Sequence, residues 1–142
     1  MKLVICEKPS VAKAVASALG VTSRADGCFE GNGLIVSWCV GHLVSPMDAA
    51  GYDLGYKKWK YDDLPILPEP FRYVLAKGKE DAFQNLKHLM EREDVTELVN
   101  ACDAGREGEL IFRLVYEMAG CQKPFSRLWI SSMEDAAIRE GF

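Results

Sequence analysis

Short apolar runs alternate with helical repeats along almost the whole chain, and this alternation limits the folds open to it. Runs of strand length occupy residues 3–6, 96–102 and 127–130, apolar residues recur at helical spacing over residues 9–19, 79–92 and 107–119, and a last helix begins near residue 134. Strands that alternate with helices lie parallel in one sheet, with helices on both faces. We therefore expect a Rossmann-like α/β fold with a mainly parallel sheet of about four strands.

Two segments depart from this alternation. Residues 27–40 predict an extra β-hairpin, because apolar runs flank the turn Gly31-Asn32-Gly33. Residues 46–72 form a long proline-containing stretch without regular pattern, in which aromatic residues are interleaved with lysines between residues 51 and 61. A stretch of this length inside a domain is usually functional or forms an interface. It could stack nucleic-acid bases or pack against further domains, and the acidic charge of the chain favours packing.

The charge of the chain limits the classes of protein to which it can belong. At 142 residues it has the length of one domain, and its formal net charge is −4. This charge argues against a general nucleic-acid coat protein, which is usually basic. It leaves room for a nucleic-acid enzyme, because a carboxylate cluster for metal lowers the net charge and DNA contacts can lie on a partner domain.

The five cysteines form no paired or zinc-binding pattern. Their number is odd, no two are spaced as C-x-x-C, and His42 and His88 are not at ligand spacing. We expect buried, reduced thiols of a cytoplasmic protein. No export signal follows Met1 and no apolar run approaches membrane-spanning length, so we expect a soluble chain without a membrane partner.

Acidic residues follow two of the expected strands. Glu7 ends the first strand, Asp103 follows the second, and Glu107 comes four residues later at the start of a helix. Ligands of open α/β sheets bind beyond the carboxyl ends of the strands, so these carboxylates should meet at one edge. Cys6 and Cys102, one residue earlier, should point into the core because strand side chains alternate. Three converging carboxylates suit Mg²⁺, which would polarise a phosphodiester.

The residues between these acids suit an anion. Gly105 lets the turn bring backbone N–H groups close, the helix N-terminus beyond it favours negative charge, and Arg106 offers a donor fork for phosphate. These acidic residues could also have a purely structural role. Glu107 and Glu109 could complement the helix dipole, and Asp103 could be a turn or cap residue.

Two segments of the chain resemble the motifs of a known family. V-I-C-E-K-P-S at residues 4–10, followed by Ala12-Lys13, resembles the opening motif of Toprim domains in type IA DNA topoisomerases. N-A-C-D-A-G-R-E-G-E at residues 100–109 resembles the second motif, D-x-D-x-E followed by G-E, and is highly specific. Residues 41–43, 64–68 and 127–132 are similar to topoisomerase III sequences. The similarity covers essentially the whole chain, in order.

This resemblance implies the fold, the chemistry and the site residues. It implies a Toprim fold, with Glu7, Asp103 and Glu107 as an acidic triad that binds Mg²⁺. It implies that Lys8 lies near the scissile phosphate, to position it or to protonate the leaving oxygen, and that Arg106 supports the phosphate or the triad.

The resemblance also implies a longer enzyme. The family cleaves one DNA strand through a 5′-phosphotyrosine, passes another strand and reseals without ATP, and its nucleophilic tyrosine belongs to a later domain. None of the five tyrosines here lies in a matching motif. We expect residues 1–142 to be a single Toprim domain from a longer multidomain protein, because the chain stops soon after its last helix opens. We expect this domain alone to bind metal and to bind single-stranded DNA weakly, but not to relax supercoiled DNA.

One position departs from the family pattern. Gly105 stands where the second motif has its second aspartate, so the site keeps three carboxylates and an arrangement of two metal ions becomes doubtful. Glu109 is a poor substitute, because two residues beyond Glu107 on a helix it points to roughly the opposite side.

Other residues have two possible roles. His42 could contact DNA near the site or be a hydrogen-bonded turn residue. Ser131 could contact phosphate, or it could open a capping pattern with the acid three residues on, as could Ser132. Trp38 and Trp129 lie in apolar runs and are expected in the core.

Other classes of protein share parts of this pattern. A primase or a metal nuclease with a Toprim domain would use the same triad with different flanking domains. A regulatory receiver-type module also gathers acids around Mg²⁺, but it needs a lysine after a later strand, and none follows Ile130.

Overall fold

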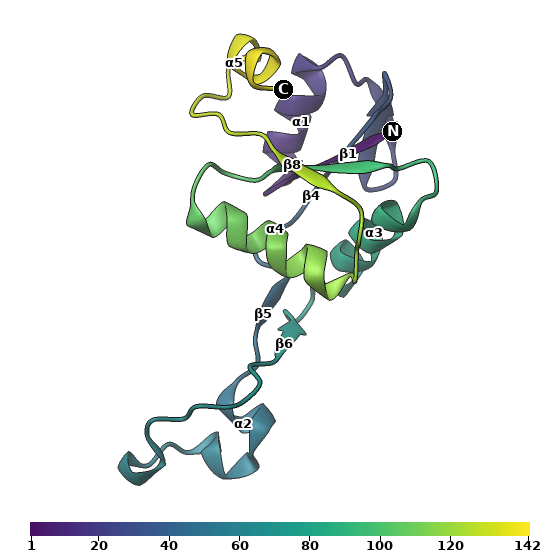
Figure 1. The fold of residues 1–142 in the computed structure, drawn as a ribbon. Coiled ribbons are helices and arrows are strands. Elements are labelled where there is room, and N and C mark those ends of the chain that lie inside the picture. Colours follow the sequence, from purple (N-terminus) through teal and green to yellow (C-terminus); the bar gives the residue numbers. More distant parts are fainter.

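The computed structural model describes residues 1–142 and builds them around a six-stranded sheet (Figure 1). The strands are β1 (Lys2–Cys6), β2 (Ser23–Ala25), β3 (Cys28–Gly31), β4 (Leu34–Trp38), β5 (Val44–Pro46), β6 (Tyr73–Leu75), β7 (Glu97–Ala101) and β8 (Phe125–Arg127). The helices are α1 (Pro9–Ala18), α2 (Ala49–Tyr52), α3 (Glu80–Glu91), α4 (Arg106–Met118) and α5 (Asp135–Gly141), with 3₁₀ turns η1 (Leu54–Lys57) and η2 (Tyr61–Asp63).

The main sheet has four parallel strands and an antiparallel edge. Its order is β2-β3-β4-β1-β7-β8, in which β1 pairs in parallel with β4 and β7, and β7 pairs in parallel with β8. The hairpin of β3 and β4 is antiparallel, as is the pairing of β2 with β3. The α/β fold, the mainly parallel sheet and the hairpin are therefore confirmed. Strand β2 was not expected, because all three of its residues are exposed and give no apolar pattern.

Helices cover both faces of this sheet, so strand β1 is buried on both sides. Leu3 and Ile5 face a core cluster shared with α3 and α4, while Val4 and Cys6 face a second cluster shared with α1 and α5. All four are fully buried. Figure 1 shows the same division, with α1 and α5 on one side of the sheet and α3 and α4 on the other. A strand buried on both faces is apolar throughout, which explains the short run at residues 3–6.

Strand β8 is shifted from its expected position. Sequence pattern placed it at residues 127–130, but it pairs with β7 over residues 125–127 and leaves the sheet after Arg127. Of residues 128–130 only Leu128 is buried, and Trp129 is 66% exposed. The prediction that Trp129 belongs to the core is therefore wrong. Trp38 is half-buried and packs on Phe29, with their ring centroids 5.7 Å apart.

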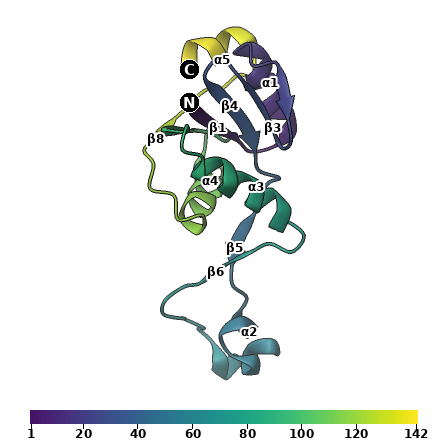
Figure 2. The same cartoon turned by 90° about the vertical axis from the view of Figure 1, so that its right-hand side faces the viewer.

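Residues 46–72 form an arm that projects from the body. Figures 1 and 2 show the two-stranded sheet of β5 and β6 leading away from α3 and α4 to α2 and the 3₁₀ turns. This stretch therefore contains short helices, although its sequence showed no regular pattern. Its tip exposes Leu54, Trp59 and Tyr61, and a cavity of about 400 Å³ opens among residues that include Tyr52 and Phe71.

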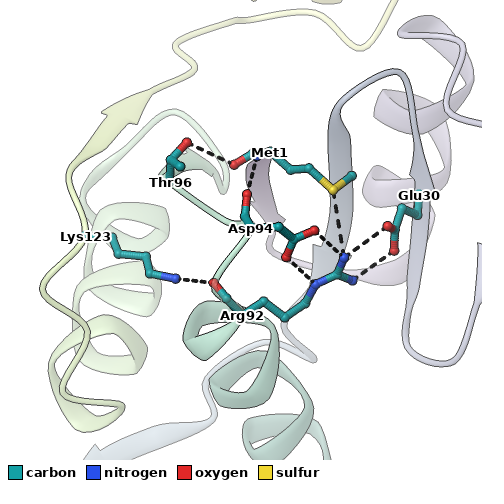
Figure 3. Close-up of polar contacts among 6 residues, drawn as sticks. All are labelled: Met1, Glu30, Arg92, Asp94, Thr96 and Lys123. Atoms are coloured by element: carbon teal, nitrogen blue, oxygen red, sulfur yellow. Dashed lines mark hydrogen bonds and ion pairs between the residues drawn. The ribbon is translucent and has the colours of Figure 1, made fainter.

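A polar cluster ties the strands together at their amino-terminal edge (Figure 3). The Arg92 guanidinium donates to Glu30 at 3.0 and 3.1 Å and to Asp94 at 2.9 and 2.8 Å. Lys123 donates to the Arg92 carbonyl, and Thr96 to the Met1 carbonyl. These bonds raise the pKa of Arg92, chiefly through Asp94, and lower the pKa of Asp94. The cluster lies at the edge opposite the predicted site, so its role is structural.

The five cysteines are all free thiols, and four of them are buried. Separately, none of the helices is both long and apolar enough to span a membrane.

Candidate metal and phosphate site

Strand pairing brings Glu7 and Asp103 together at the carboxyl-terminal edge of the sheet. Strands β1 and β7 are neighbours in parallel register, with Cys6 opposite Ala101. Glu7 follows β1 directly and Asp103 comes two residues after β7. The backbone N–H of Asp103 donates to Oε2 of Glu7 at 3.3 Å. This contact joins the Glu7 carboxylate to the backbone of Asp103 at the edge where both residues leave their strands.

Glu107 and His42 approach the same edge from two other connections. Glu107 lies in the first turn of α4 and is exposed, and its Oε2 is 3.2 Å from Nε2 of His42. His42 follows β4, whose connection is held beside β1 because the Gly41 N–H donates to the Glu7 carbonyl at 3.2 Å. His42 is therefore more than an isolated turn residue, since its side chain contacts one of the predicted acids.

Of the three predicted acids, only Glu107 forms an ion pair with a basic side chain of the chain. Glu7 and Asp103 form no ion pair, and the one pair of Glu107 is with His42, whose side chain is 41% exposed. No group of three or more His, Cys, Asp or Glu side chains is drawn together closely enough to hold an ion. The carboxylates instead lie around an exposed edge, where one oxygen of Glu7 accepts from the Asp103 N–H and one oxygen of Glu107 contacts His42, while their other oxygens and the Asp103 carboxylate have no partner within the chain. Oxygen donors without counter-charge fit a hard divalent cation, because a cation would offset their mutual repulsion.

Two cations stand beside these acids. Lys8 is the N-cap residue of α1, in extended conformation, and Arg106 is the first residue of α4. Both side chains are exposed, and neither is engaged in an ion pair within the chain. Both therefore remain available to an anion at this edge, where the N-terminus of α4 adds favourable dipole.

Gly105 and Gly108 differ in the space that a side chain would have at each position. Gly105 is extended, with φ at 171°, and a Cβ placed on it would meet nothing within 4 Å. A Cβ on Gly108 would lie 2.1 Å from the Asp103 carbonyl oxygen. Gly108 thus lets α4 press against the Asp103 turn, which sets the position of Glu107. Sequence reasoning missed this residue, although a glycine inside a helix costs stability and therefore points to a close contact.

A polar network behind the Asp103 turn was also missed. Arg127 donates to the Asp103 carbonyl at 2.6 Å and to Oδ1 of Asn100 at 2.6 Å. Asn100 is fully buried and donates to Oε2 of Glu109 at 2.9 Å, while Arg113 donates to the other Glu109 oxygen at 2.8 Å. Glu109 is thus occupied behind the turn. The signal in the sequence was Asn100, a polar residue within the apolar run of a strand.

The thiols beneath the site are neutral. Cys102 is buried on the α3–α4 side, and Cys6 is buried on the α1 side, so both point into the core as expected. A hydrogen bond with Cys39, together with burial, raises the pKa of Cys102, and burial raises the pKa of Cys6. Both thiols are removed from solvent, on opposite faces of the sheet, so neither is presented to a ligand at this edge.

Ser131 and Ser132 lie on the connection that follows β8. Ser131 is exposed, four residues after the end of β8 at Arg127. The Glu134 N–H donates to Oγ of Ser132 at 3.2 Å, and helix α5 begins at Asp135 with Glu134 as its N-cap. The expected capping pattern, with a serine as N-cap, is therefore wrong, because the helix starts later than that pattern requires.

Comparisons with known proteins agree on one family and one fold. Residues 2–133 match the family model described as the Toprim domain. The DNA topoisomerase 3 of Shouchella clausii is 48% identical over 141 residues, and that of Bacillus subtilis is 45% identical over 140 residues. Each match covers 99% of this chain and 19% of the relative, so the chain spans about a fifth of their length.

A solved structure has the same fold. The full-length topoisomerase I from Thermotoga maritima superposes with a TM-score of 0.63 at 24% identity. The match covers 98% of this chain and 20% of that chain. At this identity the likeness concerns the fold.

Proposed function

This chain belongs to the Toprim domain family, and from that membership we propose that it is the metal-binding catalytic domain of a type IA DNA topoisomerase of the topoisomerase III group. Residues 1–142 are then one Toprim domain of a longer multidomain enzyme. That enzyme cuts one strand through a 5′-phosphotyrosine, passes another strand and reseals without ATP. Its partners are a single-stranded DNA segment and the remaining domains of the same chain, in the bacterial cytoplasm.

One observation carries this proposal: the Glu7 carboxylate accepts from the Asp103 backbone across two neighbouring parallel strands. This contact joins the two motifs that resemble the family, one at residues 4–10 and one at residues 100–109. It supports a shared site at the carboxyl-terminal edge, where α/β sheets bind their ligands.

In the proposed site Glu7, Asp103 and Glu107 hold Mg²⁺. A bound Mg²⁺ would polarise the phosphodiester and offset charge on the attacking and leaving oxygens. The donor set supports this choice, because Mg²⁺ prefers a few carboxylates and completes its shell with water and phosphate oxygens. With Gly105 in place of a fourth acid, we assign the site a single ion.

The cations and polar residues around the triad bind the DNA phosphate. We assign Lys8 to the scissile phosphate, where its ammonium can orient an oxygen or donate a proton to the leaving one. Arg106 supports the same phosphate with its donor fork. We assign His42 and Ser131 further phosphate contacts, because both lie at this edge and His42 reaches Glu107.

The nucleophile comes from another part of the enzyme in this proposal. The five tyrosines of the chain are Tyr52 in α2, Tyr56 and Tyr61 in the arm, Tyr73 in β6 and Tyr116 in α4, whose hydroxyl donates to the Lys123 carbonyl. None of these positions is at the carboxyl-terminal edge, which agrees with the expectation that the domain alone relaxes no DNA.

A plasmid assay with the full-length protein tests this function. We expect relaxation of supercoiled plasmid with Mg²⁺ and without ATP, and a covalent complex through the 5′ end of the cut strand when the reaction is stopped with denaturant. A protein that only hydrolysed DNA, or that made primers, would instead indicate the Toprim domain of a nuclease or primase. Metal binding with no action on DNA would favour a regulatory module.

A further inference from the structure

A second pocket lies at the same edge of the sheet as the candidate site. The connection after β8 and one side of α5 border an open hollow of about 340 Å³, lined by Trp129, Ile130, Ser131, Ala137, Glu140 and Gly141. We propose that this pocket binds an unpaired nucleobase of the DNA strand whose phosphate lies at the candidate site, with Trp129 as the stacking surface. The proposal rests on the proposed function and adds a base-binding site to it.

Trp129 is joined to the candidate site through one side chain. Arg127 donates to the Asp103 carbonyl at 2.6 Å, and its guanidinium carbon lies 5.3 Å from the centre of the Trp129 ring. Strand pairing supports this closeness, because Asn100 of β7 is opposite Arg127 of β8. A base against Trp129 and a phosphate near Asp103 can therefore belong to the same strand.

The indole is exposed but held in place. Trp129 is 66% exposed, although it is a large apolar side chain. Arg127 stacks on it and is itself fixed by Asn100 and the Asp103 carbonyl, so the ring is oriented before any ligand arrives. Aromatic side chains beside basic grooves stack unpaired bases with little dependence on sequence.

The floor of the pocket is closely packed. A Cβ on Gly141 would lie 2.5 Å from Cγ2 of Ile130, so the end of α5 is seated directly on the connection after β8. Ile138 of the same helix is fully buried in the core cluster of the α1 side. The wall opposite Trp129 is therefore anchored to the body of the domain.

The lining favours a base over a phosphate or a protein segment. Glu140 contributes a carboxylate, which repels phosphate but accepts hydrogen bonds from the exocyclic amino group of a base. Ser131 adds a hydroxyl at the rim, which can hydrogen-bond a base as an alternative to the phosphate contact assigned to it above. The arm pocket near Trp59 is lined mostly by apolar side chains and lacks this mixture.

Binding of two matched probes to the full-length protein tests the proposal. The first probe is a fluorescently labelled single-stranded DNA of mixed sequence, and the second is an abasic strand of the same length and charge. Fluorescence anisotropy is measured for wild type, Trp129→Ala, Trp129→Phe and, as a control, Leu54→Ala, which removes an exposed apolar side chain from the arm.

Trp129→Ala should weaken binding of the first probe about 5- to 150-fold, which corresponds to the ~1–3 kcal/mol of one base–aromatic stack. Trp129→Phe should weaken it less, and Leu54→Ala should leave it unchanged. The abasic probe should bind wild type and Trp129→Ala equally. The salt dependence should be the same for both proteins, because no phosphate contact is lost.

Unchanged binding of the first probe by Trp129→Ala would overturn the proposal. So would equal weakening for both probes, which would assign Trp129 to packing within the protein. Wild-type protein that bound neither probe would instead contradict the proposed function itself, so the two failures are distinguishable.

Discussion

The backbone N–H of Asp103 donates a hydrogen bond to the carboxylate of Glu7 at 3.3 Å, across 96 residues of sequence. The parallel pairing of β1 with β7 makes this contact possible, because both residues leave their strands at the same edge. Gly108 then lets α4 press against the Asp103 turn, which brings Glu107 to the same edge. The acids are thus positioned by backbone packing and strand register rather than by ion pairs.

Removing a single acid should impair the enzyme without unfolding it. In the full-length protein, Glu7→Gln, Asp103→Asn and Glu107→Gln should each slow plasmid relaxation by on the order of tenfold or more, because each removes one negative charge from the metal site. Thermal unfolding should be unchanged, since Asp103 and Glu107 are exposed and Glu7 is half-buried. Relaxation equal to wild type in all three variants, across a magnesium titration, would show that the site is elsewhere.

Restoring an acid at position 105 should strengthen metal binding. The backbone of Gly105 is extended and its Cβ position is open, so Gly105→Asp fits without strain. The added carboxylate should tighten Mg²⁺ binding several-fold, as measured by calorimetry on the chain. Gly105→Asn is the matched control, because it fills the same space without charge and should change little. Equal or weaker binding by Gly105→Asp would mean that position 105 does not face the ion.

A methyl group at position 108 should separate α4 from the Asp103 turn. Gly108→Ala puts its Cβ against the Asp103 carbonyl, so the helix or the turn must move. We expect a loss of roughly 1–3 kcal/mol in the free energy of unfolding, together with weaker Mg²⁺ binding. Gly105→Ala should be tolerated, because the space beside it is empty. If both alanine variants had the same stability and metal affinity as wild type, the close contact would have no part in forming the site.

The Arg92 cluster should add to the free energy of unfolding at neutral pH, and this contribution should be lost at low pH. Its hydrogen bond from Arg92 lowers the pKa of Asp94, so the folded chain binds this proton less readily than the unfolded chain. The stabilisation is therefore present at neutral pH and is lost as the pH falls below about 4, the ordinary range of Asp. Arg92→Ala should lower the free energy of unfolding at neutral pH, and the difference from wild type should shrink in acid.

Urea titrations at several pH values measure this difference. Two further variants or measurements serve as controls. Lys87→Ala breaks an exposed pair with Glu91 and should cost less than about 0.5 kcal/mol. Mg²⁺ binding by Arg92→Ala should equal that of wild type, because the cluster lies at the opposite edge of the sheet. A difference between Arg92→Ala and wild type that grew in acid would contradict the account.

Local patterns in the sequence predicted β1, β7, the hairpin and the placement of Glu7 and Asp103 after β1 and β7, but not β2 or the bounds of β8. The run at residues 3–6 is apolar throughout because β1 is buried on both faces, and the acids one residue after β1 and two residues after β7 must leave the sheet at one edge. The Asn100–Arg127–Glu109 network was not predictable in the same way. This network joins β7 and β8 to α4 through side chains. Their partners can be identified only when the order of the strands in the sheet is known.

Trp129 shows most clearly that an apolar run in the sequence does not always predict burial. The run at residues 127–130 resembles a buried strand, but β8 ends at Arg127 because only residues 125–127 pair with β7. Beyond that point Leu128 still packs into the core, but Trp129 is left exposed. The arm was unpredictable for a related reason, since its short helices bury no residue and so show no apolar face.

The central claim is that Glu7, Asp103 and Glu107 form one metal site, and manganese titration of the isotope-labelled chain tests it most directly. Mn²⁺ replaces Mg²⁺ and broadens the amide resonances of nearby residues. The account predicts broadening centred on residues 7–8, 42 and 103–107, which Asp103→Asn abolishes or strongly weakens. Broadening centred instead on Glu30 and Asp94 at the opposite edge, or a pattern unchanged by Asp103→Asn, would contradict it.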